Sequence, residues 1–313
     1  MSLPLLAELV RSGYVESTHT GSVVALRPDG SIALGLGDLE RPIFPRSSNK
    51  PLQAVGLLRL GWDPDAEELA LATASHNGEQ RHVDVVRRIL SAASLDPSAL
   101  RCPAALPLHE PSAHALLAAG GVATPLLMNC SGKHAGMLAC SGADLDYLRF
   151  DHPVQVAIKG VIEDLAGEPV QHLAIDGCGA PQHALTLPGL ARAFSRLASS
   201  QAGTPERRTL DAMRGNPWLV GGTGRDVTRL MEGIPGLVAK DGAEGVYAGA
   251  LADGSAVALK IEDGAGRPRT PVLVAARRVL GVKAEVLEEL ATTPVLGGGE
   301  RVGEVRVAGQ LAG

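Results

Sequence analysis

Residues 45–61 read PRSSNKPLQAVGLLRLG, and they mark the point at which a strand pattern gives way to helices. Ser47 and Ser48 precede Lys50, and apolar residues then recur at helical spacing. One serine would suffice to cap a helix here, and Pro51 suits a first helical turn. The lysine therefore raises a second interpretation. Residues three apart share a helix face, so an amine could lie beside a hydroxyl and take its proton.

Strands are predicted on both sides of this segment. Before it, residues 22–38 (SVVALRPDGSIALGLGD) contain two apolar runs around a Pro-Asp-Gly turn, which is typical of a hairpin and is expected to open the fold. After residue 233 the predicted strands are GLVAK, GVYAGAL and AVALKIEDG, at 236–240, 245–251 and 256–264. These three form a predicted meander. Two terminal helical runs are expected from about Pro271 and Lys283.

The middle of the chain, from residue 50 to about 230, is predicted to be mostly helical. Apolar residues recur there at i, i+3 and i+4 in residues 51–61, 65–75, 80–95, 133–140 and 153–167. Strands near both ends with helices between predict an α+β fold, in which the N-terminal hairpin and the C-terminal strands form one antiparallel sheet flanked by helices. Without a convincing linker, residues 1–313 are expected to form one domain.

Composition narrows the possible functions. The chain has 313 residues, of which 45% are hydrophobic and 20% charged, as in soluble folded proteins. A net charge of −5 and 3% aromatic residues argue against a nucleic-acid partner. No segment reaches the roughly 18 apolar residues of a membrane span, and no signal-peptide pattern is visible, so we expect a cytoplasmic protein. There, the four cysteines would be core residues, metal ligands or nucleophiles.

Ser47-x-x-Lys50 is the first candidate site. A serine hydroxyl needs a base, and a lysine can be that base only as the neutral amine, which burial or a nearby positive charge such as that of Arg46 would favour. The alternative is a capped helix with a solvated lysine. Ser75, in ASHNGE, follows an apolar helical run and would ordinarily belong to a helix end.

Two further segments could carry chemistry. Cys130 and Cys178 each lie in a glycine-bordered turn, and with a nitrogen from Lys133 or His134 they could hold zinc. One cysteine per segment fits two buried thiols equally well. Lys240, in KDGAEG after a probable strand, could point its ammonium at a site, although a plain β-turn explains the same residues.

A Ser-x-x-Lys that opens a helix, followed much later by a Lys-x-Gly on a strand, resembles the serine β-lactamase, penicillin-binding protein and serine glutaminase superfamily. A closer resemblance covers nearly the whole chain. The strings RSSNKPLQ, ASHNGE, NCSGKHAGML, DGCGAP, GGTGRDVT, KDGAEGVYA and ALKIEDG occur in this order. Together they resemble the rhizobial-type L-asparaginases, the class 3 or asparaginase II family.

This resemblance implies a β-lactamase-like fold and a homodimer that hydrolyses L-asparagine to L-aspartate and ammonia. The catalytic residues that it implies are Ser47, Lys50, Ser75 and Lys240. The substrate-binding residues are Arg46 and Asp176. The zinc ligands are Cys130, Lys133 and Cys178. Lys260 lies on another late strand and is an alternative to Lys240 as the partner of Ser75.

On this basis Ser47 is expected to attack the side-chain amide with Lys50 as base, while Ser75 and Lys240 relay the proton to the leaving amine. The middle Ser-x-Asn element of β-lactamases is not visible, which argues against a cell-wall or antibiotic substrate. Glutamine remains an alternative substrate. A zinc-dependent amidohydrolase and a non-enzymatic ligand-binding protein are the alternatives from other classes.

Overall fold

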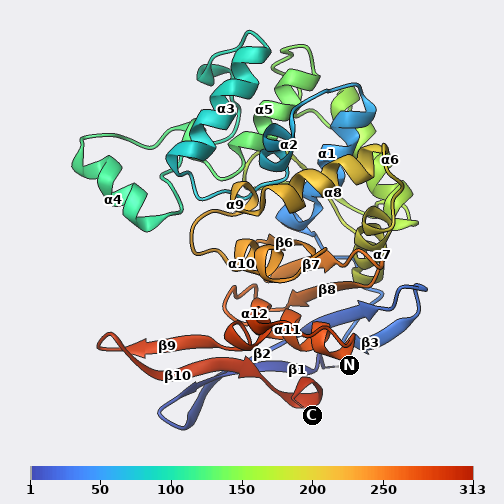
Figure 1. Ribbon diagram of the computed structural model, residues 1–313, viewed down its shortest axis with the longest axis vertical. Helices are drawn as coiled ribbons and strands as arrows, with labels where there is room; N and C mark the ends of the chain where they lie inside the picture. Colours follow the sequence, from blue (N-terminus) through green and yellow to red (C-terminus); the bar gives the residue numbers. More distant parts are fainter. Residues whose placement is uncertain (1, 313) are drawn as a thin grey trace.

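The computed structural model describes residues 2–312, which contain an eight-stranded antiparallel sheet (Figure 1). The strands are β1 (Leu5–Arg11), β2 (Tyr14–Leu26), β3 (Ile32–Leu36), β6 (Val238–Gly242), β7 (Val246–Ala250), β8 (Ala256–Ile261), β9 (Thr293–Gly297) and β10 (Glu300–Val307). Their order is β6-β7-β8-β2-β1-β10-β9, and β3 also pairs with β2. Strands from both parts of the chain thus share one antiparallel sheet, as predicted.

The long strand β2 joins the N-terminal strands to the C-terminal meander. Its first part pairs with β1, and its second part pairs with β8 from Gly21–Ile261 to Leu26–Ala256. A β-carbon at Gly21 would lie 2.2 Å from the carbonyl oxygen of Lys260, so this close approach of two strands requires glycine. Because β2 changes its partner from β1 to β8 at Gly21, this single strand connects the two parts of the sheet.

The predicted hairpin is present as β2 and β3, and the predicted meander as β6, β7 and β8. Two expectations about the ends were wrong. The sheet opens with β1, ahead of the predicted hairpin. After α11 (Arg269–Val279) and α12 (Glu285–Glu289), the chain continues into β9 and β10. Most residues of these last strands are exposed or half-buried, so the strands lack the apolar alternation that reveals a strand; β10 pairs with β1, and β9 pairs with β10.

The middle of the chain is helical, as predicted, and most of it lies on one side of the molecule in Figure 1. Its helices are α1 (Lys50–Arg59), α2 (Ala66–Ala72), α3 (Gln80–Ala92), α4 (Glu110–Ala118), α5 (Ser131–Cys140), α6 (Pro153–Ala166), α7 (Leu187–Ala198), α8 (Pro205–Gly215), α9 (Pro217–Val220) and α10 (Asp226–Gly233). A small sheet of β4 (Leu173–Ile175) and β5 (Pro181–His183) interrupts them. Both α7 and α11 pack against β2, β7 and β8. Within residues 2–312, none of the helices has the length and apolar character that a bilayer span requires.

The segment that opens α1 differs from the expected helix start. Residues 46–49 form a 3₁₀ turn, and the α-helix begins only at Lys50, with Pro51 in its first turn. Neither serine caps this helix, because Asn49 is the N-cap residue and Ser48 Oγ donates to the carbonyl oxygen of Lys240 at 3.0 Å. Ser47 therefore lies ahead of the helix, and the turn is fastened to strand β6.

The β1–β10 pairing can be tested at Gly303. A β-carbon there would lie 1.9 Å from the carbonyl oxygen of Val10. We expect Gly303→Ala to force the strands apart and lower the free energy of unfolding by about 1–3 kcal/mol. The control is Gly160→Ala in α6, where no atom lies within 4 Å, and it should stabilise the protein by about 0.5–1 kcal/mol. Urea unfolding measures both, and equal effects would contradict the pairing.

Candidate active site

An extended segment after α2 places Ser75 in the interior. The backbone N–H groups of Ser75 and Asn77 donate to the carbonyl oxygens of Val220 and Gly221, at 3.2 and 2.9 Å. The N–H of His76 donates to the carbonyl oxygen of Asn129 at 3.1 Å. Three stretches that are distant in the sequence are therefore tied together around one serine. A helix end alone would not require these contacts.

Lys50 reaches this serine. Its side chain is buried, and its Nζ donates to Ser75 Oγ at 3.1 Å and to the carbonyl oxygen of Ala74. The resemblance instead pairs Lys50 with Ser47 and Ser75 with Lys240. Ser47 is half-buried in the 3₁₀ turn, three residues before Lys50. The observed hydrogen bond thus joins the lysine of one expected pair, Lys50, to the serine of the other, Ser75.

Lys240 is fully buried on β6, and its Nζ donates to Asp241 Oδ1 at 2.6 Å and to the Asp241 carbonyl oxygen at 2.9 Å. Burial lowers the pKa of Lys240 to about 8, against the attraction of Asp241, and the positive charge of Lys50 acts in the same direction as burial. Lys260 Nζ instead donates to the carbonyl oxygens of Glu244 and Ile261, at 2.6 and 2.8 Å. Lys240 is therefore the one of these two lysines that feels the charge of Lys50.

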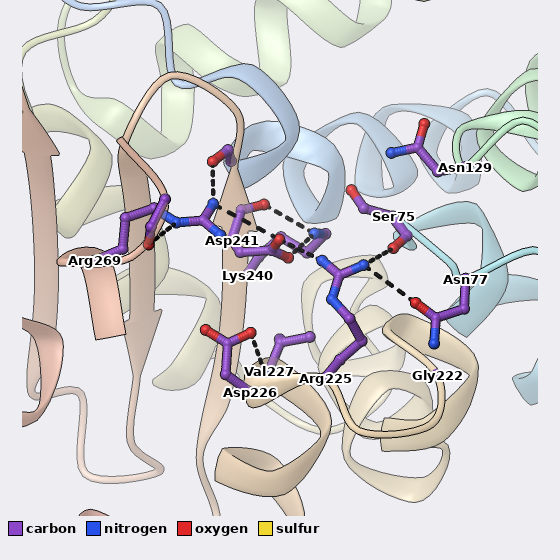
Figure 2. A network of polar contacts seen from close by, with 12 residues as sticks. Ser75, Asn77, Asn129, Gly222, Arg225, Asp226, Val227, Lys240, Asp241 and Arg269 are labelled. Carbon is purple, nitrogen blue, oxygen red and sulfur yellow. Dashed lines mark hydrogen bonds and ion pairs between the residues drawn. The ribbon is translucent and has the colours of Figure 1, made fainter. Parts of the chain in front are cut away.

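Two charged residues that the sequence reasoning did not single out complete this region, as Figure 2 shows. Arg225 donates to Asp241 Oδ2 at 2.7 Å, to the Ser75 carbonyl oxygen at 3.2 Å and to Asn77 Oδ1 at 3.4 Å. Burial would raise the pKa of Asp241, but Lys240 and Arg225 hold it well below its usual range. Both residues lie inside strings that carry the family resemblance, GGTGRDVT and KDGAEGVYA.

The two predicted substrate-binding residues contact each other. Arg46 Nε donates to Asp176 Oδ1 at 2.7 Å, and the side chains are 24% and 7% exposed respectively. Arg46 has a positive φ of 52°, which is costly for a residue with a β-carbon. Asp176 lies between the short strands β4 and β5. The structure thus forms an ion pair with a partly exposed guanidinium.

The predicted zinc ligands also gather in one place. Cys130 and Cys178 form a small buried cluster, and Lys133 Nζ donates to Cys178 Sγ at 3.0 Å. The neighbouring Cys178 and burial raise the pKa of Cys130, whereas Cys130 and the positive charge of Lys133 lower the pKa of Cys178. Among residues 2–312, no three or more His, Cys, Asp and Glu side chains are grouped to hold a metal. The predicted site differs from such a group because its third donor is a lysine.

These donors fit a soft metal ion. Two sulfurs and an amine are the donor types that suit zinc, and His134 Nε2 is buried beside them without a hydrogen-bond partner. His134 Nδ1 is already engaged with the Tyr147 hydroxyl at 2.7 Å. From the sequence, either Lys133 or His134 could supply the nitrogen. In the structure, Lys133 is the one in hydrogen-bond contact with a cysteine.

A buried histidine, which the sequence reasoning did not single out, links Ser75 to α5. His76 Nδ1 accepts from the Gly78 N–H at 3.1 Å, so Nε2 carries the proton and donates to Ser131 Oγ at 2.9 Å. Ser131 Oγ in turn donates to the Leu126 carbonyl oxygen at 2.9 Å. Burial holds the pKa of His76 well below its ordinary value. A neutral histidine thus holds the Ser75 segment against the start of the helix that carries Lys133.

The environment of Lys240 predicts a dependence of stability on pH. Its folded-state pKa of about 8 is below its ordinary value of 10.5, so above pH 8 the folded protein loses a proton that the unfolded chain retains. The stability of the wild type relative to Lys240→Met should therefore rise between pH 8 and 10, by about 1–3 kcal/mol. Urea unfolding of both proteins at pH 7 and 9.5 measures this rise. Lys283→Met, at an exposed position, is the control, and a difference that stays flat for Lys240→Met would contradict the burial argument.

Comparison with known proteins identifies the family. Two solved structures, titled as crystal structure analyses of Mglu, share 14% and 17% identity with the chain, at TM-scores of 0.44 (native form) and 0.37 (tris and glutamate form). Each match covers 83% of this chain but only 63% and 58% of the Mglu chains, so the protein spans about three fifths of their length. A search of curated protein sequences found no match. The profile of the L-asparaginase II family matches residues 7–307, and the protein therefore belongs to this family of amidohydrolases.

Proposed function

We propose that the protein hydrolyses the side-chain amide of L-asparagine to L-aspartate and ammonia. Beside the family membership, the observation that carries the proposal is the hydrogen bond between the buried amine of Lys50 and the hydroxyl of Ser75. Lys50 follows Ser47 by three residues. An amine that contacts a serine hydroxyl in the protein interior is the arrangement that serine amidohydrolases without a histidine base need. L-Glutamine, longer by one methylene, is the alternative substrate, and parallel assays of both amides decide between them.

In the proposed reaction, Ser47 Oγ attacks the amide carbon while neutral Lys50 accepts its proton. The hydrogen bond from Lys50 to Ser75 gives that proton a path to the departing nitrogen, which leaves as ammonia. Water then hydrolyses the β-aspartyl ester and restores Ser47. Exposure supports these roles, because Ser47 is half-buried and Ser75 only 4% exposed, and a nucleophile must reach the substrate.

A second assignment exchanges the two serines. Ser75 would be the nucleophile, because its hydroxyl is the one that already contacts Lys50. In either case Lys240 supplies a second buried amine, with its pKa lowered to about 8 by burial, and Asp241 and Arg225 fix its position. We propose that Lys240 does not attack the substrate but keeps the groups of the proton relay in the protonation states that the reaction needs.

Arg46 is proposed to bind the α-carboxylate of the substrate. Its guanidinium is a fork of donors that suits a carboxylate, and it is the partly exposed member of the pair with Asp176. The Asp176 side chain is 7% exposed and contacts both Arg46 Nε and, through Oδ2, the Cys178 sulfur at 3.5 Å. We therefore assign Asp176 the role of orienting Arg46 and the cysteine.

Zinc is proposed as a cofactor held by Cys130, Lys133 and Cys178. The close contacts among these three side chains and the unpaired Nε2 of His134 support this donor set. Bound there, zinc would supply a fixed positive charge that attracts and polarises groups of the substrate. The cysteines and Lys133 hold the metal, and the neutral His76 keeps α5 in register with Ser75.

We also propose a fold class, an oligomeric state and a cellular location for the protein. The antiparallel sheet built from N-terminal and C-terminal strands, with helices beside it, supports a β-lactamase-like and glutaminase-like fold in one domain. A homodimer and a cytoplasmic location are proposed from the family resemblance. Sedimentation of the purified protein and imaging of a tagged chain in the source cells test these two points.

Serine-to-alanine variants distinguish the roles. We expect Ser47→Ala to reduce ammonia release from L-asparagine by about 10³-fold or more and Ser75→Ala by about 10²-fold, because a missing nucleophile costs more than a missing relay. Ser48→Ala, which loses only the buried bond to Lys240, should keep its turnover but unfold at a lower temperature. Mass spectrometry of quenched protein identifies the acylated serine. Normal turnover in Ser47→Ala with an ester on Ser75 would favour the exchanged assignment.

Removal of metal separates the serine mechanism from a zinc hydrolase. With a serine nucleophile, a chelator should raise KM for L-asparagine and leave kcat within about tenfold, since the metal only positions the substrate. Complete loss of kcat, restored by zinc, would indicate a metal-activated water instead. Cys130→Ser should lower the zinc content measured by elemental analysis. Cys102→Ser, at a buried thiol outside the cluster of Cys130 and Cys178, is the matched control.

A further inference from the structure

The turn between β6 and β7 carries an acid that the proposed reaction does not use. Glu244 has a φ of 56°, and Arg46 has a φ of 52°. Among residues 2–312, only five non-glycine residues have a positive φ, and these two face each other, with Arg46 Nη1 and Glu244 Oε1 3.7 Å apart. Such backbone conformations are costly and persist where the surroundings impose them, often at ligand sites. Arg46 and Glu244 are therefore notable because both have this costly conformation and their side chains lie close together.

The neighbouring turn builds the position of Glu244. Lys260 Nζ donates to the Glu244 carbonyl oxygen at 2.6 Å, and the Ile261 N–H donates to the Gly245 carbonyl oxygen at 2.9 Å. A β-carbon at Gly264 would lie 2.6 Å from Glu244 Oε2, so this carboxylate lies against the backbone of a glycine. Lys260, which the sequence offered as a possible partner of Ser75, thus anchors the turn that presents Glu244.

Arg46 lies between two carboxylates of different availability. Asp176 is 7% exposed, and both of its oxygens have partners, in Arg46 and the Cys178 sulfur. Glu244 is 64% exposed, and its contact with Arg46, at 3.7 Å, is too long for a hydrogen bond. The bond from Lys260 goes to the Glu244 backbone and leaves the carboxylate accessible. The outer carboxylate is therefore the one that can accept an ammonium group.

An amino-acid head group carries a carboxylate and an ammonium on the same carbon, and the pair of Arg46 and Glu244 offers the two opposite charges side by side. Resting on the proposed function, we propose that Glu244 is a specificity-determining residue, which binds the α-ammonium of the substrate while Arg46 binds its α-carboxylate. The site then favours amides of α-amino acids over amides that lack the α-amino group. Asp176 keeps its role of orienting Arg46.

Binding without turnover tests this assignment directly. Calorimetric titration compares L-aspartate with succinate, which is the same dicarboxylate without the amino group. The wild type should bind L-aspartate more tightly, and Glu244→Gln should weaken that binding about five-fold while leaving succinate within two-fold. Glu262→Gln removes the same charge from a neighbouring exposed residue that pairs with Arg41, and it should change neither affinity. No preference in the wild type, or equal losses for both ligands in Glu244→Gln, would overturn the proposal.

Turnover separates this proposal from the proposed function. Ammonia release is measured from L-asparagine and from 4-amino-4-oxobutanoate, its analogue without the α-amino group. Glu244→Gln should raise KM for L-asparagine about five-fold at unchanged kcat and leave KM for the analogue unaltered. A wild type that releases no ammonia would overturn the asparaginase activity, and the titration would still decide the role of Glu244. Full activity with equal KM changes for both amides would overturn Glu244 alone.

Discussion

The ion pair between Arg225 and Asp241 holds the site together. Arg225 stands at the start of α10 and Asp241 on β6, and the same guanidinium donates to the backbone of Ser75 (Figure 2). Without this carboxylate, the buried cations Lys240 and Arg225 would face each other uncompensated, which is among the largest penalties in a protein interior. Because a single carboxylate serves both cations, the serine segment and the lysine strand cannot move independently. The arrangement favours a fixed geometry over maximal stability.

The sequence predicted the meander of β6, β7 and β8 and missed the outer strands β1, β9 and β10. The meander strands are buried along nearly their whole length and are therefore visible as short apolar runs separated by turns. Strand β10 carries arginine and glutamate at exposed positions, and its pairing depends on β1, at the other end of the chain. Such a partner cannot be read from a local pattern. The hairpin of β2 and β3 could be predicted because its turn is local.

The motifs named candidate side chains, but they did not predict which of these side chains are in contact. Motifs point to Ser47, Lys50, Ser75, Lys240 and the cysteines. The two cysteine segments do lie close together in the structure. The 3₁₀ turn at residues 46–49 moves Ser47 off the helix, so the spacing of three no longer implies contact, and Lys50 contacts Ser75 instead. No local pattern points to Arg225, Asp241 or His76. Their importance comes from burial and from partners that are more distant in the sequence. A charged residue beside a motif lysine is ordinary until it is known to be buried.

The pairing of β1 with β10 has a consequence for how the chain acquires its structure. Ala7 pairs with Val307, so partners in one ladder are separated by nearly the entire sequence. Their contact must close a very long loop, much longer than the one that brings α1 and α6 together in the helical part. During synthesis the first strands emerge long before the residues that cover their edges, and they stay exposed to wrong pairing until β10 has been made. Because β10 itself covers the free edge of β1, the charges that obscured this strand in the sequence cannot protect that edge until β10 has been made.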